Sequence, residues 1–214
     1  AKIAEKIGKK NQIEYFKKFG FYEKINLELE ETSLSLVPKH WKKIETMTIG
    51  YGHGFSITPL HLCQAYASIV NDGLKVNPTL LKNKHFNIPK RVVKSTTSAE
   101  VKKLLRSVIL ETQYTGPRVR IPGYDLGGKT GTAELINVNG YSSDSNLTLF
   151  ISVFPIYNPK YVVLAIVEDP KKIKEENYSI TGATVAAPLV RNIILNIIKI
   201  YNIPAFTETN MLKV

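Results

Sequence analysis

The feature that most constrains the fold of this 214-residue chain is a change in the spacing of its apolar residues. Up to about residue 111, apolar residues recur at the intervals of amphipathic helices. Beyond residue 131, apolar and β-branched residues gather in short runs separated by turn signals, as in antiparallel strands. Helices are therefore expected in the first part of the chain, and strands without regular alternation with helices after it.

The N-terminal part is expected to be helical. Residues 2–19 carry apolar side chains at helical spacing, and Gly8 and Gly20 are the expected stops, so two short helices are predicted. Thr58 followed by Pro59 has the chemistry of an N-cap and a first helical residue. Another helix is therefore predicted to begin there.

A further helix is predicted before the chain changes to strands. Thr97–Glu100 reads as a capping box, which opens a helix to about Glu111. The apolar residues expected on its buried stripe are Val101, Leu104, Leu105, Val108 and Ile109.

The strand region is predicted to be a three-stranded antiparallel meander. Thr132–Val138 leads to Asn139-Gly140, the commonest hairpin turn pair. Leu147–Phe154 and Tyr161–Val167 are apolar and β-branched, as expected of the next two strands.

A C-terminal helix is predicted from about Gly182 to Tyr201, despite Pro188. It is expected to lie across the sheet. The residues expected on one side of it are Val185, Leu189, Ile193, Ile197 and Ile200.

Composition excludes few functions. The chain carries 29 basic and 18 acidic residues, a formal charge of +11, but the lysines are scattered and no arginine block is present. We expect a solvated surface and no nucleic-acid binding. Polar residues interrupt the apolar segment from 185 to 200, so no stretch is expected to span a bilayer.

Gly123–Glu134 is the stretch with the most chemical content, and it admits two interpretations. Gly123–Thr130 matches the phosphate-loop pattern Gly-x-x-x-x-Gly-Lys-Thr. Lys129-Thr130-Gly131 also matches the lysine-threonine-glycine element of penicillin-recognising enzymes. The surroundings of the stretch have to decide between them.

The phosphate loop requires a strand before the glycines and a helix beginning near the lysine. Ile121-Pro122 is a poor end for a central strand. Glu168-Asp169, at the end of an apolar run, is typical of a magnesium-binding acidic strand, but Pro170 follows directly. The chain also lacks the alternating strands and helices of a parallel nucleotide-binding sheet, so this interpretation is the weaker one.

The second interpretation places the lysine on an edge strand beside a cleft. Gly127, Gly128 and Gly131 would remove side-chain obstruction from a peptide pairing along the strand. Lys129 supplies a positive charge, and Thr130 and Thr132 supply hydroxyls able to hold a carboxylate. The backbone N–H of Thr132 would point at a developing oxyanion. A glycine-rich strand edge with an ordinary surface lysine stays open as the simpler alternative.

The wider pattern resembles the C-terminal half of class B penicillin-binding proteins, most closely the cell-division type of peptidoglycan D,D-transpeptidase. The segments that carry the resemblance, in order and spacing, are Ile49–Leu60, Gln64–Ser68, Asn71–Gly73, Gly123–Glu134 and Ala186–Pro188. The resemblance implies that Lys129, Thr130 and Gly131 form the catalytic lysine strand. It further implies that Gly128, Thr130 and Thr132 bind substrate, and that Thr132 contributes an oxyanion-hole N–H.

The sequence departs from the family at its nucleophile. The family carries its serine in a Ser-x-x-Lys motif and has a second motif, Ser-x-Asn, and neither occurs in these residues. We therefore expect residues 1–214 to be the C-terminal part of a single transpeptidase domain that begins just after the second motif. Without the serine no acyl-enzyme forms, so the chain is predicted to be inactive alone.

The resemblance also implies a setting. The fold would be α+β, of the penicillin-binding transpeptidase (β-lactamase-like) type, reduced to a helical segment, three antiparallel strands and the C-terminal helix packed on them. The ligands would be peptidoglycan stem peptides and β-lactams, with no metal or nucleotide cofactor. The complete protein would lie on the periplasmic face of the bacterial inner membrane, with a divisome glycosyltransferase as partner. A β-lactamase-like serine hydrolase and a non-enzymatic interaction module remain as alternatives.

Overall fold

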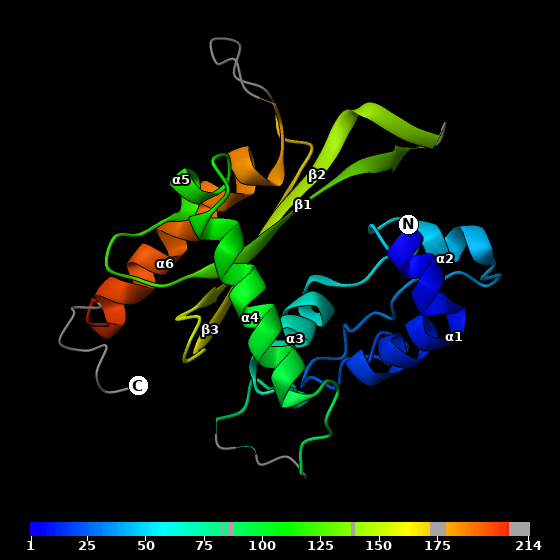
Figure 1. The fold of residues 1–214 in the computed structure, drawn as a ribbon, viewed down its shortest axis with the longest axis horizontal. Coiled ribbons are helices and arrows are strands. Elements are labelled where there is room, and N and C mark those ends of the chain that lie inside the picture. Colours follow the sequence, from blue (N-terminus) through cyan, green and yellow to red (C-terminus); the bar gives the residue numbers. More distant parts are fainter. Residues whose placement is uncertain (83, 85–87, 138–139, 172–178, 206–214) are drawn as a thin grey trace. The chain divides into compact units, whose positions relative to one another are not determined.

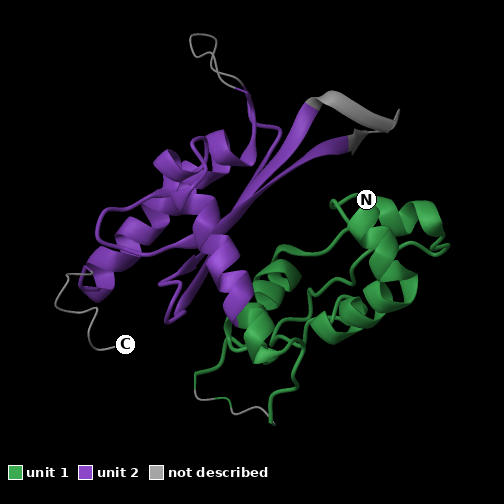
Figure 2. Ribbon diagram, viewed as in Figure 1, with its two compact units in different colours: residues 1–98 green, residues 99–214 purple. Residues whose placement is uncertain are grey.

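The computed structural model describes residues 1–82, 84, 88–137, 140–171 and 179–205 (Figure 1). The chain divides into two compact units, residues 1–98 and 99–214 (Figure 2), and each is described by itself. The expectation that both belong to one transpeptidase domain concerns a longer protein and stays a prediction.

The first unit begins with an interrupted helix. Helix α1, Lys2–Phe19, leaves helical geometry at Gly8, where φ is 77°, and ends at Gly20, where φ is 82°. Both angles lie in the left-handed region that glycine adopts without a steric penalty. The predicted pair of short helices with these two stops is therefore confirmed. Helix α2, Lys43–Ile49, follows.

An aromatic cluster packs the first unit. The ring of Phe16 lies 5.5 Å from that of Trp41, 5.3 Å from Phe21 and 4.8 Å from Phe55, measured between centroids. Trp41 Nε1 donates a hydrogen bond to Thr46 Oγ1 at 3.0 Å, so the buried indole keeps a partner for its N–H. The cluster joins α1 to the connection that follows it.

Helix α3, Pro59–Val70, begins where the sequence predicts. The hydroxyl oxygen of Thr58 accepts a hydrogen bond from the backbone N–H of His61 at 3.2 Å, which satisfies one of the free donors of the first turn. Its buried residues include the polar His61, Gln64 and Ser68 as well as apolar ones. These polar side chains hydrogen-bond to backbone groups of neighbouring loops.

The predicted capping box at Thr97–Glu100 is wrong. Helix α4, Ser95–Leu110, already includes these residues, and Ser98 is a buried side chain within its first turns. The carboxylate of Asp72 accepts hydrogen bonds from Ser95 Oγ and from Arg91 Nη2. A residue more than twenty positions away therefore anchors the helix start, instead of the local box.

The second unit contains the sheet. Strands β1, Gly127–Asn137, β2, Gly140–Phe154, and β3, Tyr161–Glu168, pair antiparallel in the order β1-β2-β3. The predicted meander and α+β class are confirmed. Strand β1 begins five residues before the predicted Thr132, because the glycine-rich segment also pairs with β2. Residue 139 of the predicted hairpin turn lies outside the described residues.

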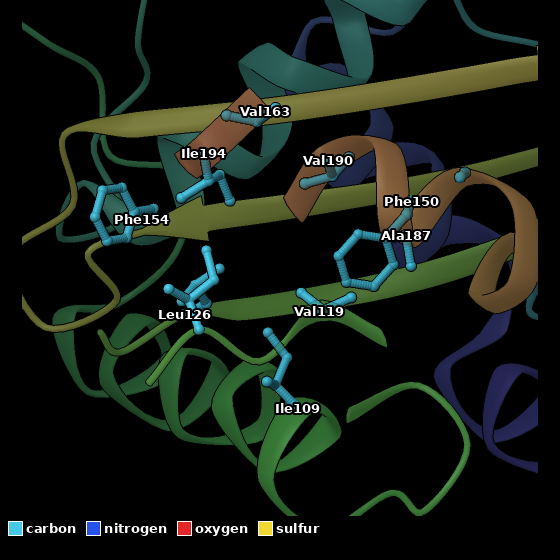
Figure 3. Close-up of a cluster of buried hydrophobic side chains, with 11 residues drawn as sticks. Ile109, Val119, Leu126, Phe150, Phe154, Val163, Ala187, Val190 and Ile194 are labelled. Carbon is cyan, nitrogen blue, oxygen red and sulfur yellow. The ribbon is translucent and has the colours of Figure 1, made fainter. Parts of the chain in front are cut away.

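The sheet and its covering helices share one core. Helix α5, Gly116–Val119, and a π-helical turn η1, Gly182–Ala186, which continues into α6, Ala187–Tyr201, complete the unit. Figure 3 shows the buried cluster formed by Ile109, Val119, Leu126, Phe150, Phe154, Val163, Ala187, Val190 and Ile194. On α4, Leu105 and Ile109 are buried but Leu104 is exposed, so the apolar stripe of this helix is narrower than predicted.

The C-terminal helix is confirmed, but two of the residues expected on one side of it, Leu189 and Ile193, do not belong to the core. Leu189 and Ile193 are 45% and 42% exposed, whereas Val190 and Ile194 are fully buried against the sheet. Both stripes are apolar, so helical spacing alone does not choose between them. Ala187, Val190 and Ile194 form the buried stripe, and Figure 3 shows Ala187 beside Phe150 of the sheet.

The combined segment Gly182–Tyr201 is long and apolar enough to cross a membrane by length and composition, contrary to the expectation from sequence. Only 28% of its most apolar window is buried within the described structure. A helix that covers a sheet also meets this criterion, and α6 contacts both β2 and β3.

Candidate functional site: the lysine strand

The residues Lys129, Thr130, Gly131 and Thr132 lie in the first half of β1. Strand β1 is an edge strand of the described sheet, paired only with β2, with Lys129 opposite Ile151 and Thr130 opposite Phe150. The phosphate-loop interpretation is wrong, because it requires a helix at Lys129 and the chain is a strand there. Within the described residues, no group of three or more His, Cys, Asp or Glu side chains is placed to hold a metal ion.

Two glycines let β1 approach its neighbours closely. A Cβ at position 128 would lie 2.5 Å from Phe150 Cζ and 2.8 Å from the backbone oxygen of Ile151. Gly128 therefore answers a packing requirement within the core. A Cβ at Gly131 would meet the side chain of Leu149 at 2.9 Å, so this position also excludes a side chain.

Lys129 presents its charge at the surface. Its side chain is exposed, and Nζ donates a hydrogen bond to the backbone oxygen of Thr130 at 2.8 Å. Among the described residues no carboxylate lies within ion-pair distance of this ammonium group. An anionic ligand would therefore not have to displace an acidic side chain.

The sequence did not reveal the contact between β1 and η1. The backbone N–H of Gly182 donates to Thr132 Oγ1 at 3.1 Å. A Cβ on Gly182 would lie 2.6 Å from the backbone oxygen of Gly131, so only glycine fits this crossing. Thr132 still has a hydroxyl hydrogen to donate to a ligand. The sequence does offer a signal for the start of η1 itself, because Thr181 is a residue type that caps helices. Its hydroxyl oxygen accepts a hydrogen bond from the backbone N–H of Thr184.

An ion pair positions the start of β1. Arg106 donates to Asp125 Oδ1 from Nη2 at 2.6 Å and from Nε at 3.2 Å, which ties α4 to the residues just before the strand. The backbone oxygen of Asp125 accepts from Ile156 N at 3.0 Å, and Ser152 Oγ donates to the backbone oxygen of Gly127 at 2.9 Å. The glycine-rich segment is thus held on a rigid sheet, which suits a binding site.

Comparison with known proteins identifies the family. The family model of the penicillin binding protein transpeptidase domain matches residues 1–195. The probable peptidoglycan D,D-transpeptidase FtsI of Caulobacter vibrioides is 29% identical over 97% of this chain and 37% of its own length. The stage V sporulation protein D of Bacillus subtilis is 31% identical over 89% of this chain and 31% of its own length. The chain thus spans about a third of these relatives.

Solved structures agree. Penicillin binding protein 3 of Mycobacterium tuberculosis, complexed with ampicillin, superposes with a TM-score of 0.83 at 28% identity, over 96% of this chain and 49% of that one. The apo transpeptidase domain of penicillin-binding protein 3 from Burkholderia pseudomallei also gives 0.83 at 28% identity, over 96% of this chain and 62% of that one. The chain therefore belongs to the penicillin-binding protein transpeptidase family.

Proposed function

We propose that the complete protein is a peptidoglycan D,D-transpeptidase that cross-links stem peptides in septal cell-wall synthesis and binds penicillin. This chain supplies the lysine strand of its site. The observation that carries the proposal is the Lys129-Thr130-Gly131 sequence on an edge strand, in a chain that belongs to the transpeptidase family. The name of the Caulobacter relative and the ampicillin complex of the mycobacterial structure support both the reaction and the ligand class.

Each residue of the strand has a distinct role in this proposal. The Lys129 ammonium and the Thr130 hydroxyl bind the carboxylate of the donor peptide or of a β-lactam. Gly128 and Gly131 keep β1 packed closely against β2, so that the free edge of the strand is held ready for the peptide backbone. The backbone N–H of Thr132 donates to the oxyanion that forms during acyl transfer.

In this proposal the nucleophilic serine belongs to a part of the protein other than this chain. A serine attacks the penultimate D-alanine carbonyl, the peptide C–N bond breaks, and terminal D-alanine leaves with the proton. The amine of a neighbouring stem then attacks the acyl-serine ester and regenerates the hydroxyl. The present chain contains no Ser-x-x-Lys sequence, so we expect it to form no acyl-enzyme alone. The site works at the periplasmic face of the inner membrane, beside a divisome glycosyltransferase.

Labelling with a fluorescent penicillin tests the proposal. The chain is incubated with the reagent alone, and again after it has been joined to the nucleophile-bearing half of the transpeptidase domain of a relative. We expect no covalent band from the isolated chain and a stable band from the joined protein. Labelling of the isolated chain would refute the assignment of the nucleophile, and an unlabelled but folded joined protein would refute the function. Rapid loss of the label would indicate a β-lactamase-like hydrolase.

A further inference from the structure

A polar cavity lies within the first unit, apart from the lysine strand. Its volume is about 200 Å³, room for a small ion or a few waters. It is formed by the end of α1, the residues after it, the middle of α3 and the segment after α3. The lining residues used below are Glu23, Lys24, Asn26, Gln64, Lys75 and Asn77.

The charge of Lys75 is poorly compensated. Its side chain is only 18% exposed, and the hydrogen bond that its Nζ donates to Glu23 Oε2 is long, 3.4 Å, and reaches a side chain that is 69% exposed. A largely buried ammonium group is unfavourable unless close acceptors replace its water. Gly20 makes the room for this group, because a Cβ there would lie 3.0 Å from Lys75 Nζ. The cavity therefore holds a cation with unused capacity for an anion.

Partly buried hydrogen bonds fix the walls of the cavity. Gln64 Nε2 donates to the backbone oxygen of Val76 at 2.8 Å, and Val76 N donates to Ser68 Oγ at 3.0 Å. His61 Nε2 lies 2.9 Å from the backbone oxygen of Glu23, a residue of the cavity wall. Because His61, Gln64 and Ser68 are buried, the site is formed before any ligand arrives.

We propose that this cavity binds a small anion that carries a carboxylate or a phosphate group. The Lys75 ammonium makes the central ion pair with the anion. Lys24 and the side-chain amides of Asn26 and Asn77 donate from the rim, where all three residues are exposed. The carboxylate of Glu23 is the competing counter-ion and turns toward solvent when the ligand binds.

Nuclear magnetic resonance titration of the 214-residue chain tests the proposal. Sodium phosphate and sodium acetate are added separately at constant ionic strength, with sodium chloride as the reference, so that the two anion sources are distinguished. We expect saturable shifts of the side-chain amide signals of Gln64 and Asn77 with at least one of the two anions. No saturable shift with either anion would overturn the proposal.

Two variants assign the binding to the cavity. Lys75→Met should weaken it about tenfold or more, as loss of a charge-assisted hydrogen bond requires. Lys39→Met, an exposed lysine in the same unit that does not line the cavity, should leave it unchanged. Equal affinity in Lys75→Met would overturn the proposal. If that variant does not fold, Glu23→Gln decides: loss of the competing carboxylate should tighten binding, and weaker or unchanged binding would overturn it.

Discussion

Gly128 is a residue whose lack of a side chain holds β1 in place. A methyl group there would lie 2.5 Å from Cζ of Phe150, whose side chain is fully buried. We expect Gly128→Ala to lower the free energy of unfolding by about 1–3 kcal/mol, the usual cost of overpacking a core. Urea denaturation measures this, with Ala133→Ser on the exposed part of the same strand as the control. Equal stability of wild type and Gly128→Ala would contradict the packing.

Glu28 is the residue that ties a later loop to the segment after α1. Hydrogen bonds from Lys84 Nζ, Thr79 Oγ1 and Leu80 N lower the pKa of its carboxyl to about 2. A pKa lowered by folding adds stability above the ordinary pKa, and that stability is lost as the pH falls through the ordinary value toward 2.

Wild type should have a higher free energy of unfolding than Glu28→Gln at pH 6. This difference should shrink steadily as the pH falls to 3. Urea denaturation at each pH measures it. Thr79→Val, which removes one of the hydrogen bonds, should give a smaller pH dependence than wild type. A difference that does not vary with pH would rule out this role of Glu28.

Local chemistry decided which residue predictions were right. Thr58 caps α3 and Gly20 ends α1 through contacts within a few residues, which sequence shows directly. Thr97 and Glu100 misled the capping prediction, because α4 already begins at Ser95, which donates a hydrogen bond to Asp72. The contact of Gly182 with Thr132 spans 50 residues, so no local pattern indicates it.

At the scale of elements, α6 shows the limit of periodicity. Adjacent isoleucines lie on its two sides, Ile194 fully buried against the sheet and Ile193 partly exposed. We expect Ile194→Ala to lower the free energy of unfolding by about 2–5 kcal/mol, the range for a buried isoleucine. Ile193→Ala should cost clearly less. Equal losses in chemical denaturation would mean that the helix does not face the sheet as described.

The strands were more predictable than the faces of the helices. The meander was predicted from the turn pair Asn139-Gly140 and from the apolar runs Leu147–Phe154 and Tyr161–Val167. Short apolar runs and turn residues are local signals, and they are enough to indicate strands. The interpretation of Lys129-Thr130-Gly131 as a lysine strand placed this segment on β1 correctly, whereas strand preferences alone put the start at Thr132, because Gly127–Gly131 is glycine-rich. Pairing with β2 overrides that preference.

At the scale of the whole molecule, the edge of β3 is exposed to self-association. Among the described strands β3 pairs only with β2, and Val162–Val167 is an unbroken apolar run. Such an edge offers free backbone groups to another chain. We expect Ile166→Lys, at a position 37% exposed, to reduce aggregation of the isolated chain in size-exclusion chromatography. Ile88→Lys, at a position 93% exposed in the other unit, is the control, and an equal effect there would exclude the edge as the cause.

The candidate site was predictable only in part, because its ligand-binding residues are neighbours in the sequence whereas the residues that support them are not. Lys129, Thr130 and Thr132 are neighbours on one strand, so a short sequence identifies them. Their supports, such as the ion pair between Arg106 and Asp125, come from segments far apart in the chain. The proposed serine is not among these residues, and the chain spans 49% of the mycobacterial structure that it matches.

The most direct test of the proposed role of Lys129 is the rate at which a fluorescent penicillin acylates this chain after it has been joined to the nucleophile-bearing half of a relative's transpeptidase domain. If Lys129 binds the carboxylate, Lys129→Met should lower the second-order rate constant by about a hundredfold, the range for losing one partner of a close charge pair. Lys199→Met, on an exposed position of α6, should react as wild type does. A Lys129→Met protein that is folded and acylated at the wild-type rate would contradict the central claim.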